Sequence, residues 1–263
     1  MLIKRLAKRI IFLKPYDVVL NPVTLSQKLF DAVIIDLDGT MVDTMGDFVL
    51  ALNSMLAELP LTGKARVDLP VVERMVGKGS EHLIRSVLEH ISPADARAPV
   101  LFDAAFASFQ NHYDAINGQN SAVYPGVLEG LGGLQQAGLK LACLTNKPLT
   151  FARELLRLKG LNGFFNEVFG GDSFERKKPD PMPLLKTCEA LGAIPARTLM
   201  VGDSSNDALA ARAAGCPVVL VTYGYNHGEP VRSVDADGFV DSLLELDFRT
   251  LKKGPQAPSR VMR

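Results

Sequence analysis

The chain has 263 residues, 47% of them hydrophobic, and its 29 lysines and arginines balance its 29 aspartates and glutamates. This size allows one large core, or a core with a smaller second unit, and the zero net charge gives no reason to expect nucleic acid as a partner. The odd number and wide spacing of Cys143, Cys188 and Cys216 argue against a disulfide framework, so we expect a protein of the reducing cytoplasm.

A basic segment opens the chain. Residues 1–14 contain five lysines and arginines among apolar residues at roughly helical spacing. The apolar run Ile10–Leu13 is far shorter than the roughly 20 residues that span a bilayer, and no signal-peptide cleavage pattern follows it. We expect residues 1–30 to be an extension that packs on the core, is disordered or arises from an upstream start codon. A short amphipathic helix on an anionic membrane is the less favoured alternative.

Two acidic residues follow the first apolar run. The run Ala32–Ile35 is typical of a central parallel strand that is buried on both faces. Asp36 and Asp38 come directly after it, before the turn at Gly39. In open α/β sheets the ligand crevice lies beyond the carboxyl ends of the strands, where buried acids are costly unless a cation or a reaction uses them. The alternative is an Asx turn that ends the strand without chemistry.

The segment 49–119 has a different pattern, with apolar residues at helical spacing and no evident strand. Helices are expected over Phe48–Leu59, Leu69–Val76, Ser80–Ile91 and Pro93–Ile116. We predict an all-helical cap domain, inserted after the first strand, that covers the pocket and excludes bulk water. The crossings at residues 44–47 and 119–125 would be its hinges.

Within this insertion a lysine stands between two glycines. Gly77-Lys78-Gly79-Ser80 opens the third predicted helix, where free backbone N–H groups favour an anion. We predict that Lys78 binds the carboxylate of a small substrate. A plain turn between two helices would show the same pattern.

Polar residues also follow two later strands. The apolar stretch Leu139–Leu144 ends in Thr145 and Asn146, and the stretch Thr198–Val201 ends in a segment with two aspartates, Asp203 and Asp207. Helix capping would explain each pair singly. Their common position at strand ends favours one shared site.

A lysine pair lies between these two strands. Lys177 and Lys178 precede Pro179 and a helix that starts near Met182. The pattern alone leaves open which lysine faces the site, and solvation of both is the alternative.

These segments together predict an α/β fold with a doubly wound parallel sheet. The core would comprise residues 31–48 and 120–250, followed by a basic, proline-rich tail at 251–263. The strands are expected at Ala32–Ile35, Lys140–Leu144, Glu167–Phe169, Thr198–Val201 and Pro217–Thr222. Crossover helices are expected to start near Gly126, Pro148, Pro181 and Asn206.

The polar motifs resemble those of the haloacid dehalogenase superfamily of phosphohydrolases. The four matching motifs are Asp36-x-Asp38-Gly39-Thr40, Thr145-Asn146, Lys178-Pro179 and Gly202-Asp203-x-x-x-Asp207. The resemblance extends from about residue 31 to residue 246. Because the family lysine directly precedes proline, it favours Lys178 over Lys177.

Four stretches resemble the bacterial phosphoglycolate phosphatases more narrowly. They are Tyr124-Pro125-Gly126-Val127, Leu144-Thr145-Asn146-Lys147-Pro148, Lys177-Lys178-Pro179-x-Pro181 and Thr222-Tyr223-Gly224-Tyr225-Asn226. The match is poor between about residues 47 and 119.

Each motif has a chemical role in such a reaction. A carboxylate can attack a phosphoryl group and form an aspartyl-phosphate, and Asp36 is the candidate nucleophile. Asp38 can act as general acid to the leaving alcohol and then as general base for water. The phosphoryl oxygens need positive charge and donors, which Lys178, Thr145 and Asn146 can supply.

The same motifs imply a metal. Two acids would repel a phosphate dianion unless a cation lay between them, and Mg²⁺ prefers oxygen ligands. The resemblance implies ligation by the Asp36 carboxylate, the Asp38 backbone carbonyl and Asp203. Asp207 would stand behind them and hold metal-bound water or Lys178.

Three functions fit these observations. The first is a Mg²⁺-dependent phosphomonoesterase that converts 2-phosphoglycolate to glycolate and phosphate. The second is a related phosphatase or mutase acting on a sugar phosphate or mononucleotide, and the third is a non-catalytic binding module. A small phosphorylated metabolite is the expected partner, and the protein is expected to be a monomer or a homodimer.

Overall fold

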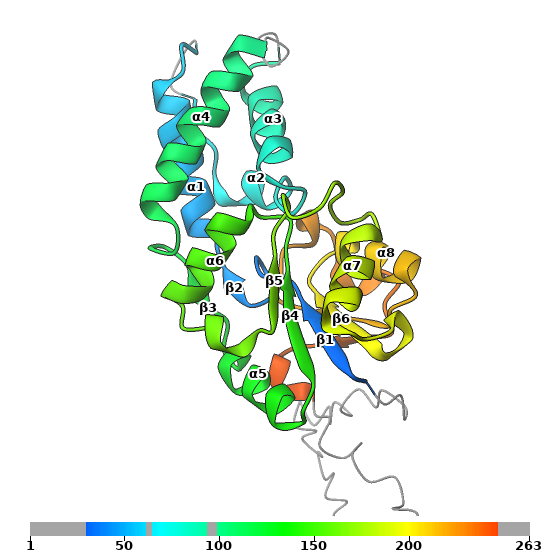
Figure 1. Cartoon of the computed structure of the whole chain (residues 1–263). Helices are drawn as coiled ribbons and strands as arrows, with labels where there is room; N and C mark the ends of the chain where they lie inside the picture. The colour runs from blue at the N-terminus through cyan, green and yellow to red at the C-terminus, as the bar shows by residue number, and fades with distance from the viewer. Residues whose placement is uncertain (1–29, 62–64, 94–98, 247–263) are drawn as a thin grey trace, which may run out of the picture.

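A six-stranded parallel sheet forms the centre of the computed structural model, which describes residues 30–61, 65–93 and 99–246 (Figure 1). The strand order is β5-β4-β1-β6-β7-β8, so β1 lies in the middle. The strands are β1 (Ala32–Ile35), β4 (Lys140–Leu144), β5 (Glu167–Phe169), β6 (Thr198–Gly202), β7 (Val218–Val221) and β8 (Gly238–Val240). The predicted doubly wound parallel sheet is confirmed. The edge strand β8 was not predicted, because three residues beginning with glycine give no apolar run.

Helices cover both faces of the sheet (Figure 1). Val33 and Ile35 of β1 pack in one apolar cluster with α5 and α6, while Ile34 packs in another with α7 and α8. Burial on both faces therefore explains the continuous apolar run in β1. These helices are α5 (Val127–Gln136), α6 (Leu149–Leu158), α7 (Met182–Leu191) and α8 (Ser205–Ala214). Short 3₁₀ turns occur at Asn162–Phe164, Pro195–Arg197, Asn226–Gly228, Val231–Ser233 and Leu243–Glu245.

Four helices stand beyond one end of the sheet, at the top of Figure 1. They are α1 (Met45–Glu58), α2 (Leu69–Glu73), α3 (Ser80–Ile91) and α4 (Pro99–Ile116). They enclose an apolar cluster of their own, with Leu52, Ile84 and Phe109 in its centre. No strand occurs among the described residues between Met45 and Ile116, as predicted. α1 begins earlier than expected and α2 ends earlier, because residues 74–77 form a turn.

A small two-stranded sheet joins this helical insertion to the core. β2 (Val42–Asp43) pairs antiparallel with β3 (Ala122–Val123), and neither strand was predicted because each has only two residues. The fully buried Asp47 accepts hydrogen bonds from the backbone N–H groups of Gly118 (2.8 Å) and Asn120 (2.7 Å) and from the Ser121 hydroxyl. One carboxylate thus ties the chain leaving the core to the chain returning to it. The predicted hinges lie here, and their movement stays a prediction.

Replacing Asp47 with alanine is expected to lower the free energy of unfolding by about 2–4 kcal/mol, since buried N–H groups of the returning chain would lose their acceptor. Urea denaturation measures this change. Asp114, an exposed residue of α4, is the matched control; its replacement by alanine should change the stability by no more than about 0.5 kcal/mol. Equal stability of the two variants would contradict the role of Asp47.

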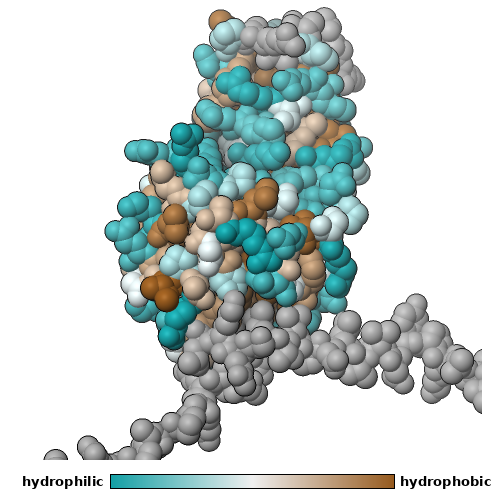
Figure 2. All heavy atoms as spheres, turned by 90° about the vertical axis from the view of Figure 1, so that its right-hand side faces the viewer, coloured by the Kyte–Doolittle hydropathy of each residue, from teal (hydrophilic) through white to brown (hydrophobic). Residues whose placement is uncertain are grey.

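The surface is mixed where the structure describes it. Figure 2 turns the side of α7 and α8 toward the viewer and shows apolar side chains standing among polar ones. Leu185 and Leu209 are two of the exposed apolar side chains on these helices. Among the described helices, none combines the length and apolarity needed to cross a membrane. All three cysteines are free and buried. The predictions for residues 1–30 and 251–263 fall almost wholly outside the described residues.

Candidate active site

The carboxyl ends of the central strands bring the predicted residues together. Because β1 pairs with β4 on one side and β6 on the other, the residues that follow these strands become neighbours. Asp36 follows β1, Thr145 follows β4 and Asp203 follows β6. Strand pairing, not sequence proximity, therefore assembles the site.

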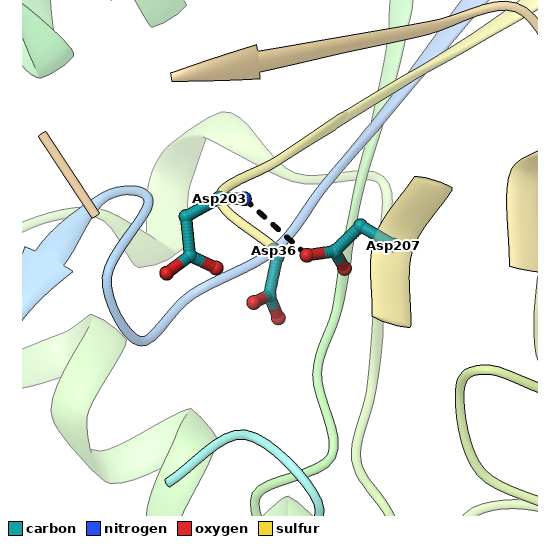
Figure 3. A group of neighbouring side chains, drawn as sticks. All are labelled: Asp36, Asp203 and Asp207. Atoms are coloured by element: carbon teal, nitrogen blue, oxygen red, sulfur yellow. Dashed lines mark hydrogen bonds between the residues drawn. The ribbon is translucent and has the colours of Figure 1, made fainter. Parts of the chain in front are cut away.

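Three of the acids form a buried cluster (Figure 3). Asp36, Asp203 and Asp207 each place a carboxylate oxygen within 4.8 Å of the others. Asp207 lies in the first turn of α8, and its Oδ2 accepts hydrogen bonds from the backbone N–H groups of Asp203 (3.3 Å) and Ser204 (3.2 Å) and from the Ser204 hydroxyl (2.9 Å). Asp207 is thus held from both the strand end and the helix start.

Lys178 is the cation in contact with this cluster. Its Nζ donates to Asp207 Oδ1 (2.7 Å) and to the Leu144 carbonyl (2.8 Å), and it lies 2.9 Å from Asp36 Oδ1. Lys178 is 4% exposed, whereas the Lys177 side chain is exposed. Burial would lower the pKa of the Lys178 ammonium, but the charges of Asp207 and Asp36 outweigh burial and raise it.

The cluster carries more negative charge than one lysine can balance. Burial raises the pKa of Asp36 to about 7, although Lys178 opposes this rise. Burial and the charges of Asp207 and Asp36 likewise raise the pKa of Asp203 well above its usual value. In spite of the ion pair with Lys178, Asp36 Oδ1 is buried and accepts no hydrogen bond from any described residue. These features fit a divalent cation among the carboxylates.

Asn146 uses its side chain to join three loops. Its Nδ2 donates to the carbonyls of Gly77 (2.9 Å) and Lys178 (2.8 Å), and its Oδ1 accepts from the Lys178 N–H (3.0 Å). Both amide hydrogens are therefore engaged. Thr145 Oγ1 accepts from the Lys147 N–H (3.2 Å), which leaves the Thr145 hydroxyl hydrogen available for a ligand.

The helical insertion covers the pocket above these residues. Six of its residues line the pocket: Phe48, Val76, Gly77, Gly79, Ser80 and Leu83. The Gly77 carbonyl also accepts from Asn206 Nδ2 (3.1 Å), and the Val76 carbonyl lies 2.8 Å from His227 Nδ1. Two side chains of the core thus contact the backbone carbonyls of the loop that precedes α3.

Lys78 does not line this pocket. Its side chain is exposed and lies in a neighbouring groove with Glu81, His82, residues 175–177, Pro179 and Asp180. Gly77, Gly79 and Ser80 of this loop line the pocket, and the binding of a substrate carboxylate by Lys78 stays a prediction.

Lys147 and Tyr225 are among the residues of the site that the sequence analysis did not predict. Lys147 is 5% exposed and donates from Nζ to Asp38 Oδ1 (2.8 Å) and Tyr113 Oη (2.6 Å). The N–H of Tyr225 donates to Asp203 Oδ2 (2.7 Å). Both belong to stretches that resemble the phosphoglycolate phosphatases, but nothing in the sequence pattern around them indicates a contact with an aspartate.

Position 39, in the turn that follows Asp38, requires a glycine. Gly39 has a φ of +82°, which favours glycine. A Cβ atom there would also collide with Asp203 Oδ2 and lie 2.9 Å from the Tyr225 ring. The turn after Asp38 can therefore approach Asp203 only without a side chain.

Fold and site together define an α/β protein with a carboxylate–lysine centre at the carboxyl edge of its sheet, covered by inserted helices. The family model of haloacid dehalogenase-like hydrolases matches residues 30–215, and the chain belongs to this family. The resemblance seen in the motifs is thereby confirmed.

Relatives resemble the chain over most of its length. A phosphoglycolate phosphatase from Thiobacillus denitrificans is 44% identical over 221 residues, which cover 84% of this chain and 96% of the relative. One from Nitrosospira multiformis is 44% identical over 214 residues, covering 81% and 92%. The crystal structure of a predicted phosphoglycolate phosphatase from Haemophilus somnus superposes with a TM-score of 0.79 at 32% identity, covering 86% of this chain and 99% of that one.

Proposed function

We propose that the protein is a Mg²⁺-dependent phosphomonoesterase whose substrate is 2-phosphoglycolate. The buried cluster of Asp36, Asp203, Asp207 and Lys178 at the bottom of the covered pocket is the observation that carries the reaction class. The substrate is proposed from the relatives named phosphoglycolate phosphatase at 44% identity. A small phosphorylated metabolite fits a pocket enclosed between the sheet and the insertion.

Asp36 is the proposed nucleophile. Attack of its carboxylate on phosphorus would form an aspartyl-phosphate and release the alcohol, and water would then hydrolyse the acyl-phosphate. Lys178, 2.9 Å from Asp36 Oδ1, places positive charge beside the phosphoryl oxygens. The Thr145 hydroxyl and the backbone N–H of Asn146 are the proposed neutral donors to those oxygens.

Asp38 is the proposed acid and base. Its side chain lines the pocket beside Asp36. As a general acid it would protonate the leaving alkoxide of glycolate, and as a general base it would take a proton from the attacking water. Asp36 would thus form the covalent intermediate, and Asp38 would transfer the protons.

The residues present fit Mg²⁺. Asp36 and Asp203 would provide carboxylate oxygens and Asp38 its backbone carbonyl, while Asp207 has its oxygens engaged by Lys178, Ser204 and the Asp203 N–H. Mg²⁺ bound there supplies positive charge that lets phosphate approach the carboxylates.

Mg²⁺ is expected to stabilise the protein more at pH 8 than at pH 5. The pKa of Asp36 rises from 3.8 to about 7 on folding without metal, so the folded state holds a proton that the unfolded state has released. Without Mg²⁺, stability should therefore fall as the pH rises from about 4 to about 7, and Mg²⁺ should bind once the carboxylate is ionised. Melting temperatures in EDTA and in Mg²⁺ from pH 4 to pH 8 measure both effects. An equal Mg²⁺ increment at both pH values would contradict the assignment.

Phosphate release across a small panel tests the function. The panel holds 2-phosphoglycolate, a hexose phosphate, a mononucleotide and p-nitrophenyl phosphate, each compared by kcat/KM with Mg²⁺. A preference for 2-phosphoglycolate of about tenfold, or about 1.4 kcal/mol, is expected. A preference for the sugar phosphate would reject the substrate and keep the reaction, while no release from any compound would reject the phosphatase itself.

A further inference from the structure

One buried cation of the pocket has no part in the reaction described above. Lys147 follows Thr145 and Asn146 beyond β4, and its side chain lines the pocket. Its Nζ lies 2.8 Å from Asp38 Oδ1, and only 2% of the Lys147 side chain is exposed.

Lys147 holds one particular oxygen of Asp38. Asp38 Oδ1 accepts from Lys147 Nζ (2.8 Å) and from the Thr44 hydroxyl (2.8 Å). Asp38 Oδ2 accepts no hydrogen bond from the described residues, and the side chain is 11% exposed. The carboxylate is thus fixed through one oxygen and has the other free for proton transfer.

The lysine is itself held by the helical insertion. Its Nζ donates to Tyr113 Oη of α4 (2.6 Å) and lies 4.7 Å from the ring centroids of Tyr113 and Phe48. Such ring faces attract a buried ammonium. A second bond and two aromatic faces therefore restrict the position from which Lys147 reaches Asp38.

The hydroxyl of Tyr113 has little freedom. Its ring stacks on Phe48 (centroids 5.3 Å apart) and Phe109 (5.4 Å) and meets Phe151 of α6 edge-on (5.2 Å). Phe151 belongs to the core, so Tyr113 packs against both parts of the molecule. The chain of contacts from Phe151 through Tyr113 and Lys147 ends at Asp38.

We propose that Lys147 is a positioning residue: together with Thr44 it orients Asp38 for proton transfer, and Tyr113 of the insertion holds Lys147 in place. The inference rests on the proposed function, in which Asp38 serves as general acid and base. The helical insertion then has two roles: it covers the pocket, and through Tyr113 and Lys147 it orients Asp38 for proton transfer.

The alternative occupation for Lys147 is direct binding of the substrate carboxylate. The two roles differ in their dependence on the leaving group. An orienting role matters when the departing oxygen needs a proton, as in 2-phosphoglycolate, and matters little when p-nitrophenolate departs unprotonated. A binding role would instead raise KM for the acidic substrate and leave kcat unchanged.

The test compares Lys147→Met with wild type on both substrates, in the presence of Mg²⁺. The kcat for 2-phosphoglycolate, or for the best alkyl phosphate of the panel, should fall about 100-fold, whereas the first-turnover release of p-nitrophenolate should fall no more than about threefold. Tyr113→Phe keeps the ring and removes the hydroxyl. It should also lower kcat for 2-phosphoglycolate more than the release of p-nitrophenolate, but by a smaller factor than Lys147→Met. Lys186→Met, at an exposed lysine paired with Glu189, is the matched control and should behave as wild type.

The role of Lys147 would be overturned if the first-turnover release of p-nitrophenolate fell as much as the kcat for 2-phosphoglycolate, or if only KM rose. Circular dichroism and melting temperatures establish whether the variants fold. If Lys147→Met does not fold, the contrast between the two substrates in Tyr113→Phe tests the proposal. The proposed function is judged separately, because a wild-type protein that releases no phosphate with Mg²⁺ rejects it whatever the variants do.

Discussion

Replacing Asp36 with asparagine is expected to lower kcat by at least about 10⁴-fold while the fold persists. The amide is nearly the same size as the carboxylate but cannot attack phosphorus or form an acyl-phosphate. It also relieves the burial of a charge whose pKa the site raises to about 7, so the melting temperature without metal should not fall. Steady-state phosphate release and thermal unfolding of the same preparation measure the two properties.

The control for this variant lies at the other end of the same strand. Asp31 precedes β1, and its exposed side chain pairs with Arg197 at 2.6 Å. Asp31→Asn should keep full activity, because it changes a charge of the same type far from the pocket. Appreciable turnover by Asp36→Asn would reject Asp36 as the nucleophile.

Replacing Lys178 with methionine is expected to damage both activity and stability. The change removes the ammonium between Asp36 and Asp207, and loss of one partner of a buried ion pair costs about 3–5 kcal/mol. The rate should fall about 10²–10³-fold, as for other losses of a charge-stabilising donor. Mg²⁺ should recover part of the stability, since it brings positive charge back to the carboxylates.

The neighbouring lysine provides a matched control for this second variant. Lys177→Met makes the same chemical change one residue earlier, on an exposed side chain. Its stability should stay within about 0.5 kcal/mol of wild type and its kcat should be unchanged. Similar losses in the two variants would contradict the assignment of Lys178, which the sequence pattern alone left open between the two residues.

The parts of the fold that could be predicted have strong local patterns. β1 and β4 are apolar runs buried on both faces, and α3 repeats apolar residues at helical spacing; all three have the predicted limits. β2, β3 and β8 have only two or three residues each, too few for a period. Their pairing depends on segments far away in the chain, as in the contact of Val42 with Val123.

Residues of the site were predictable where a motif marks a strand end. Asp36 and Asp203 follow apolar runs, and the order of the sheet brings them together. Lys147 was missed because its role depends on the direction of its side chain, toward Asp38. Tyr225 was missed because it contacts Asp203 through its backbone N–H, which every residue type except proline has. Lys78 shows the converse: a glycine-flanked lysine at a helix start has the pattern of an anion site, yet its side chain turns into the neighbouring groove.

The most direct test is to trap phosphate on Asp36. Asp38→Asn should accept a phosphoryl group from p-nitrophenyl phosphate with Mg²⁺, because that leaving group needs no acid, and should hydrolyse the intermediate slowly for want of a base. After acid quenching, peptide mapping by mass spectrometry should find phosphate on the peptide that contains Asp36 and a matching burst of p-nitrophenolate. A burst with phosphate on another residue, or turnover with no covalent phosphate on the protein, would contradict nucleophilic catalysis by Asp36.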